Sequence, residues 1–110
     1  MHHPKALGVL LAAAIAVAAN AGATSAAVPY PRSMAALGDS LTLAYPNTVE
    51  ESWATGGNSL VRSHYLRILA AGGGAIRGHA YNLAVPSASF LAMQAQARHA
   101  LGKRVEYVTV

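Results

Sequence analysis

Cysteine is absent from this 110-residue sequence, and charged side chains make up only 11% of it. The absence of cysteine excludes disulfides, thiolate zinc sites and cysteine nucleophiles. The scarcity of charge, beside 54% hydrophobic residues, excludes a disordered acidic or basic tail. The net charge of +4 comes from scattered residues. A nucleic-acid surface would need a stripe of Lys and Arg with interleaved aromatic residues, and the sequence contains none.

The amino-terminal segment predicts a secretory signal peptide over residues 1–26. Lys5 precedes an apolar run of 14 residues, Ala6–Ala19, and small residues follow the run. This order of charged, apolar and small-residue regions is typical of a signal peptide, and a membrane span would need about 20 apolar residues. The alternative is an uncleaved amino-terminal anchor. We expect cleavage between about residues 23 and 27, a secreted protein with no stable membrane span, and one domain over residues 27–110.

The remainder alternates between strand and helix patterns, which predicts a parallel α/β sheet of β-α-β-α-β order. The first helix is expected to place Val61, Tyr65, Ile68 and Leu69 on one face, and the second to bury Phe90, Met93, Ala97 and Leu101. The predicted elements are a strand at 33–37, a mostly loop segment at 41–57 with a short helical turn, a helix from the cap Asn58 to about Ala71, a strand over 81–85, a helix capped by Ser87 or Ser89 and ended by Gly102, and a strand at 105–110.

The last predicted strand reaches Val110 with no turn or covering helix after it. Parallel sheets are normally covered on both faces, so we expect a fragment of a longer domain. An unpaired strand edge promotes association, and we expect the fragment to be only marginally soluble.

One tripeptide is a candidate catalytic motif. Gly38-Asp39-Ser40 directly follows the first predicted strand, and sites in open α/β sheets form beyond the carboxyl ends of strands. Glycine allows a tight exit from the strand. The Ser40 hydroxyl could then project from the sheet, with its own N–H available to an oxyanion. The same tripeptide is also ordinary turn chemistry.

The segment Met34–Ala44 (MAALGDSLTLA) resembles the first sequence block of the GDSL, or SGNH, hydrolases, and is especially similar to their phospholipase B-like branch. The similarity continues, in the same order, through nearly all of the predicted mature chain. It includes Ser52–Gly57, the Ser63-His64-Tyr65 helix, Asn82–Ala88, Ala95–Arg98 and Tyr107–Val110.

This resemblance implies a secreted esterase or lipase on a flavodoxin-like three-layer α/β/α fold, here truncated to its amino-terminal half. It assigns Ser40 as the nucleophile and as an oxyanion N–H donor. The family's second-block glycine falls at Ser87, whose N–H could still donate to the oxyanion. The asparagine block and the Asp-x-x-His block of the family are absent, and we expect the 110-residue chain alone to be inactive.

Three further residues are assigned to the substrate side of the site: Asp39, Trp53 and Asn82. Trp53 could line the substrate cleft or cover the edge of the sheet. The Asn82 amide could order the loop around the active site or satisfy nearby backbone groups, and we favour loop ordering.

None of the mature-chain histidines, His64, His79 and His99, has an aspartate three residues earlier, so none is expected to be the base for Ser40. Their spacing predicts no metal site. We expect a serine ester hydrolase that acts on a lipid or small-molecule ester without an organic cofactor or nucleic acid. The alternative is a non-catalytic secreted fragment or mispredicted product, which would bind a partner or be degraded.

Overall fold

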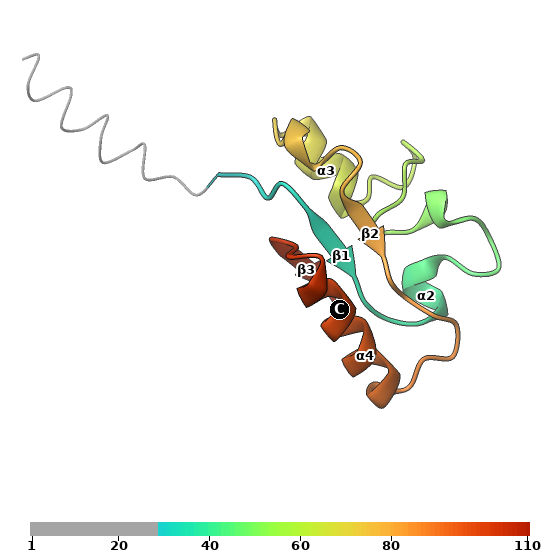
Figure 1. The fold of residues 1–110 in the computed structure, drawn as a ribbon. Helices are drawn as coiled ribbons and strands as arrows, with labels where there is room; N and C mark the ends of the chain where they lie inside the picture. The colour runs from blue at the N-terminus through green and yellow to red at the C-terminus, as the bar shows by residue number, and fades with distance from the viewer. Residues whose placement is uncertain (1–28) are drawn as a thin grey trace, which may run out of the picture.

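The computed structural model describes residues 29–110, so the expected signal peptide and its cleavage site lie outside the described residues. Strands and helices alternate along the chain, as Figure 1 shows. The strands are β1 (Met34–Ala36), β2 (Ala80–Asn82) and β3 (Tyr107–Thr109); the helices are α2 (Ser40–Leu43), α3 (His64–Ala70) and α4 (Phe90–Gly102), with short 3-10 turns η1 (Val49–Glu51) and η2 (Gly74–Ile76).

The three strands form one parallel sheet of order β2-β1-β3. The central strand β1 is completely buried, with all three residues at 0% exposure. A short apolar run without charge suits this position, because a central parallel strand is covered on both faces. The predicted β-α-β-α-β order and the parallel α/β class are confirmed.

The two faces of the sheet are covered by different parts of the chain. Ala35 and Leu37 pack with Ala100 of α4 in the hydrophobic core. Side chains alternate along a strand, so Met34 and Ala36 face the other way, together with Tyr107, the register partner of Met34. Tyr107 contacts the first residue of α3 on that side. Helices therefore lie on both faces of the sheet.

Helix α3 begins later than predicted. Asn58 accepts a hydrogen bond from the Leu60 N–H at 3.0 Å, but this caps only a turn. Arg62 then adopts a left-handed conformation with φ of 54°, which interrupts any helix. Ser63 is the observed cap, because its hydroxyl accepts from the Leu66 N–H at 3.1 Å.

The predicted buried stripe of α4 is wrong at two positions. Phe90 and Leu101 are each 76% exposed, whereas Gln96 and Ala100 are buried. The cap Ser89 and the end at Gly102 are as predicted. The helix is rotated relative to the expectation because a polar residue, Gln96, has a binding partner in the interior, as described below.

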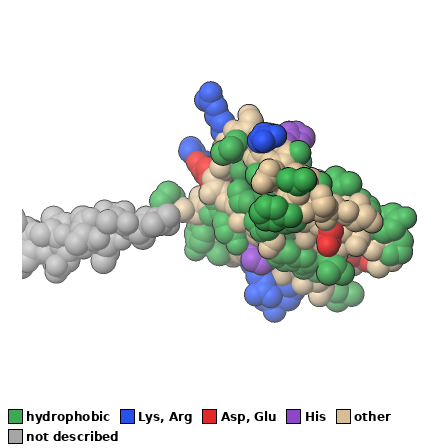
Figure 2. All heavy atoms as spheres, turned by 90° about the horizontal axis from the view of Figure 1, so that it is seen from below, with side chains coloured by type: hydrophobic (Ala, Val, Ile, Leu, Met, Phe, Trp, Pro, Cys, Tyr) green, Lys and Arg blue, Asp and Glu red, His purple; other side chains and the backbone are tan. Residues whose placement is uncertain are grey.

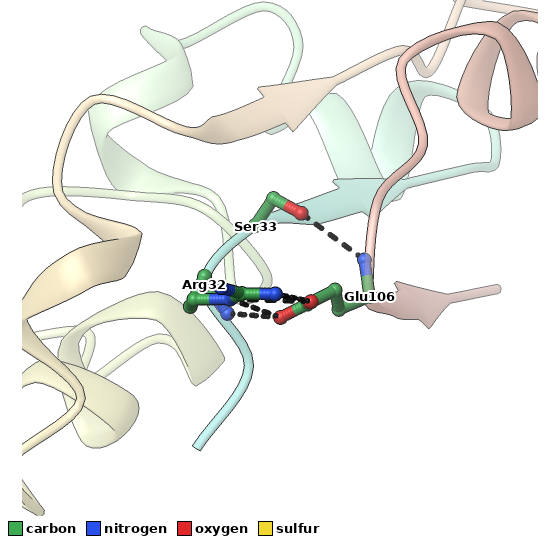
Figure 3. A network of polar contacts seen from close by, with 3 residues as sticks. All are labelled: Arg32, Ser33 and Glu106. Carbon is green, nitrogen blue, oxygen red and sulfur yellow. Dashed lines mark hydrogen bonds and ion pairs between the residues drawn. The ribbon is translucent and has the colours of Figure 1, made fainter. Parts of the chain in front are cut away.

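An exposed ion pair joins the segment before β1 to the segment before β3 (Figure 3). The Arg32 guanidinium donates to both carboxylate oxygens of Glu106, with the shortest contact at 2.7 Å, and the Arg32 backbone N–H donates at 2.8 Å. Ser33 contributes its hydroxyl as an acceptor for the Glu106 N–H at 3.1 Å. Hydrogen bonds from the Arg32 side chain, then from its backbone, lower the pKa of Glu106 to about 2.

We predict that this pair makes stability depend on acid pH. The folded-state pKa of Glu106 lies below its ordinary value of 4.5, so its stabilising effect is complete above that pH and is lost as the pH falls toward 2. The melting temperature of Glu106→Gln should lie below that of the parent at neutral pH and converge with it near pH 2.

The matched control is Glu51→Gln, an exposed carboxylate with no ion pair among the described residues. High salt should reduce the difference in melting temperature between the parent and Glu106→Gln, because salt screens exposed ion pairs. If this difference in melting temperature stayed the same from neutral pH to pH 2, the ion pair would not be the cause of the acid dependence.

Candidate active site at the end of the central strand

Ser40 lies at the carboxyl end of β1, as predicted. Gly38 leaves the strand with φ of 148°, and a Cβ there would collide with the Thr42 side chain. Asp39 then caps α2, because its carboxylate accepts from the Leu41 N–H at 3.0 Å. Ser40 is thus the first residue of this short helix. The tight strand exit that the glycine predicts is present, and the Asp39 side chain is engaged as a helix cap.

The reactive groups of Ser40 are unengaged within residues 29–110. Its carbonyl accepts from the Tyr45 N–H at 3.0 Å, while neither its hydroxyl nor its N–H forms a hydrogen bond to another described residue. The residue is half-buried. The hydroxyl and the N–H of Ser40 are therefore both available for hydrogen bonds to groups outside residues 29–110.

The strand exit is held by a buried amide from α4. Gln96, only 6% exposed, accepts from the Gly38 N–H at 2.8 Å and donates to the Gly38 carbonyl at 3.0 Å. The same carbonyl accepts from the Val85 N–H at 3.2 Å. The sequence analysis missed this residue. Its signal was a polar side chain at helical spacing from Met93 and Ala100, in the interior stripe of α4.

A second amide orders the loops on the other face of the sheet. Asn82 shares its Nδ2 group among the Thr42 carbonyl at 3.0 Å, the Ser52 hydroxyl at 3.1 Å and the Thr55 hydroxyl at 2.9 Å. Its Oδ1 accepts from the Ala84 N–H at 3.2 Å. The amide donors are therefore used within the protein, and Asn82 joins β2 to the loop after α2. Asn82 thus binds two loop hydroxyls, as loop ordering requires, and two backbone groups, as the alternative requires.

Ser87 occupies a backbone conformation that favours glycine. The Ala88 N–H donates to the Val85 carbonyl at 3.1 Å, which closes a turn with Pro86 and Ser87 at its centre. Ser87 has φ of 63°. Proline followed by a positive-φ residue is the pattern of a type II turn, where glycine is preferred at the second central position. The Ser87 N–H has no hydrogen-bond partner among residues 29–110.

Trp53, in the loop before α3, forms an aromatic cluster with His64 of α3 and Tyr107 of β3. Its ring lies edge-on to His64, with centroids 5.4 Å apart, and the His64 Nδ1 is 2.8 Å from the Tyr107 hydroxyl. Tyr107 is in register with Met34, the first residue of β1, whereas Ser40 follows the end of that strand. These contacts favour the interpretation that Trp53 covers the edge of the sheet, and within residues 29–110 no ring contact or hydrogen bond joins it to Ser40.

No base for Ser40 is found in the part of the chain that the structure describes. His64 is paired with Tyr107, the His79 Nδ1 is 3.3 Å from the Tyr81 hydroxyl, and His99 is exposed in the last turn of α4. Within the same residues no His, Asp and Glu side chains cluster as metal ligands. No helix between residues 29 and 110 has the length and apolar character needed to cross a membrane.

The chain matches no family model, no curated protein and no solved structure in the comparisons with known proteins. A functional proposal therefore depends on the sequence motif and on the geometry around Ser40.

We predict that Gln96→Leu destabilises the fold by about 2 kcal/mol, because it leaves the buried Gly38 N–H without an acceptor. Urea unfolding followed by circular dichroism measures the change. Gln94→Leu is the control on an exposed face of the same helix, and we expect it to change stability by less than about 0.5 kcal/mol. Equal destabilisation by the two substitutions would contradict the role of the Gln96 amide in holding the Gly38 peptide group.

We predict that Ser87→Gly stabilises the chain by about 0.5–1 kcal/mol. Glycine relieves a left-handed conformation that costs other residues about 1–2 kcal/mol, and part of this gain is offset by a more flexible unfolded chain. Ser59→Gly, in an exposed segment without positive φ, should give no gain in the same unfolding measurement. A loss of stability in Ser87→Gly would show that the serine side chain is needed.

Proposed function

We propose that this chain carries the nucleophile of a serine ester hydrolase of the GDSL/SGNH type, on the amino-terminal part of a flavodoxin-like α/β/α fold. One observation carries the proposal. Within a GDSL-like motif, the Ser40 hydroxyl and N–H lie at the carboxyl end of the central strand, unengaged by other described residues. The substrate class is a carboxylic ester of a lipid or a small acyl group, and the protein is secreted.

In the proposed reaction, the Ser40 oxygen attacks the ester carbonyl and the alkoxide leaves, so that an acyl-serine forms. Water then attacks this acyl group and releases the acid. The N–H groups of Ser40 and Ser87 are the proposed donors to the oxyanion, where charge develops only in the transition state. Asp39 and Asn82 hold the surrounding loops, and no organic cofactor takes part.

The proton of the Ser40 hydroxyl needs an acceptor, because an alcohol is a weak nucleophile until a base removes its proton. No histidine among residues 29–110 forms a hydrogen bond to Ser40. We therefore propose that residues 29–110 supply the nucleophile and the oxyanion donors, and that the base comes from outside them.

The lack of a described base favours a second candidate, a non-catalytic secreted module that binds a partner. Under this alternative the Gly38-Asp39-Ser40 segment acts only as a strand exit and helix cap, and Ser40 carries no chemistry. The two candidates differ in whether Ser40 can be acylated.

We predict that added imidazole, acting as the missing base, gives Ser40-dependent hydrolysis of p-nitrophenyl butyrate by the full chain. After subtraction of the reaction of imidazole in buffer, Ser40→Ala should lower the rate by about tenfold or more, because general-base assistance contributes about 10²–10⁴. Mass spectrometry should locate a butyryl group on the peptide that contains Ser40.

Ser59→Ala is the matched control, since Ser59 is an exposed serine outside the site, and it should keep the full rate. Hydrolysis that survives Ser40→Ala, or an acyl group found on another residue, would remove Ser40 from the mechanism. No acylation of a folded chain would favour the non-catalytic module.

A further inference from the structure

A polar cavity of about 450 Å³ lies beside the start of β2. Its walls come from the loop that contains η1, from helix α3 and from the turn that leads into β2. Ala80, which lines the cavity, is in register with Met34, the first residue of β1. Ser40 follows the opposite end of β1. The cavity is therefore separate from the candidate active site.

This cavity belongs to the β2 edge of the sheet. The strand order β2-β1-β3 places β3 on the opposite side of β1, as Figure 1 shows. Strands added beside β3 would extend the sheet away from the cavity. The larger α/β fold proposed above would therefore leave the β2 edge and its cavity in place.

The Glu50 carboxylate is placed at the cavity by its own loop. The Glu50 carbonyl accepts from the Asn58 N–H at 2.9 Å, which closes the loop over residues 50–58. The Glu50 Oε2 occupies the space that a Cβ on Gly57 would need, and both residues line the cavity. Glycine at position 57 thus leaves room for a negative group at this wall.

Two opposite charges line the cavity without neutralising each other. Among residues 29–110, neither the Glu50 carboxylate nor the Arg77 guanidinium forms an ion pair, although both line the cavity. Charged side chains are few and separated on the face drawn in Figure 2, so two opposite charges at one cavity are a local concentration. A ligand that carries both charges could pair with each, and charge-assisted hydrogen bonds are stronger than neutral ones.

The wall that α3 contributes is largely apolar. Tyr65, Leu66 and Leu69 line the cavity, and each of them is half-buried. Tyr65 and Leu69 are four residues apart and so lie on the same face of the helix. An apolar group placed against this wall would be removed from water, which favours binding. The cavity thus offers a carboxylate, a guanidinium and an apolar surface to one ligand.

We propose that this cavity binds a free α-amino acid with an apolar side chain. The ammonium group of the ligand pairs with Glu50, its carboxylate pairs with Arg77, and its side chain lies against the α3 wall. A free amino acid fits because it carries both charges on the atom next to its side chain. This site is independent of the proposed ester hydrolysis.

The first test uses the full chain and L-leucine in isothermal titration calorimetry, which should show saturable binding. N-acetyl-leucine lacks the ammonium charge and leucinamide lacks the carboxylate. Each should bind about tenfold more weakly, because one charge-assisted contact is lost. Glycine, which has no side chain to place against α3, should also bind more weakly than leucine.

Protein variants assign each ligand charge to its partner. Glu50→Gln should remove the preference for leucine over N-acetyl-leucine, and Arg77→Gln should remove the preference over leucinamide. Glu51→Gln and Arg98→Gln are the matched controls, because these exposed residues do not line the cavity, and they should keep both preferences. Circular dichroism establishes that each variant is folded.

The proposal is overturned if the folded parent chain shows no saturable binding of leucine. It is also overturned if N-acetyl-leucine and leucinamide bind as tightly as leucine, because the two charges then play no part. Folded Glu50→Gln and Arg77→Gln variants that keep both preferences would overturn it as well. If a variant does not fold, the ligand series on the parent chain decides the outcome.

Discussion

The peptide groups of Gly38 are the point on which the arrangement around Ser40 depends. The Gly38 N–H and carbonyl are both bound by the Gln96 amide, and the carbonyl also accepts from Val85. Three separate segments therefore meet where β1 ends: the strand itself, helix α4 and the loop after β2. Because the contacts are buried, the cost of losing one includes the desolvation of an unpaired polar group. The direction in which the chain leaves β1, and hence the position of Ser40, is fixed from outside the motif.

The order of elements could be predicted because it depends on local patterns. A short apolar run predicted the first strand, alternating apolar residues the second, and β-branched and aromatic residues the third. Ser89, one of two cap candidates, and Gly102 are the observed ends of α4. The boundaries of α3 could not be predicted in the same way. Asn58 has the chemistry of a cap and does cap a turn, but the left-handed Arg62 delays the helix to Ser63. Local propensity does not reveal such a conformation, because a left-handed backbone is rare in residues such as arginine.

The prediction of the buried face of α4 was wrong for a different physical reason. A hydrophobic stripe assumes that polar residues face water, whereas Gln96 is buried because its amide matches both groups of one peptide unit. Rotation toward this partner leaves Phe90 and Leu101 exposed. Asn82 follows the same rule on the other face of the sheet, where its amide binds a carbonyl and two hydroxyls. Both amides have partners far away in the sequence, so only the folded chain identifies them.

The proposed function places two different demands on this protein, oxyanion stabilisation and proton transfer. Donors to an oxyanion act well when they are held in place before the reaction, so that no reorganisation is needed as charge develops. The proposed donors are the N–H groups of Ser40, which follows the Gly38 peptide group bound by Gln96, and of Ser87, which lies in the turn closed by Val85 and Ala88. Proton removal instead needs a titrating side chain within hydrogen-bond reach of the hydroxyl. The described histidines are engaged with tyrosines or exposed on α4. In the proposed reaction a base is needed twice, once to take the proton of the Ser40 hydroxyl and once to take a proton from the water that hydrolyses the acyl-serine.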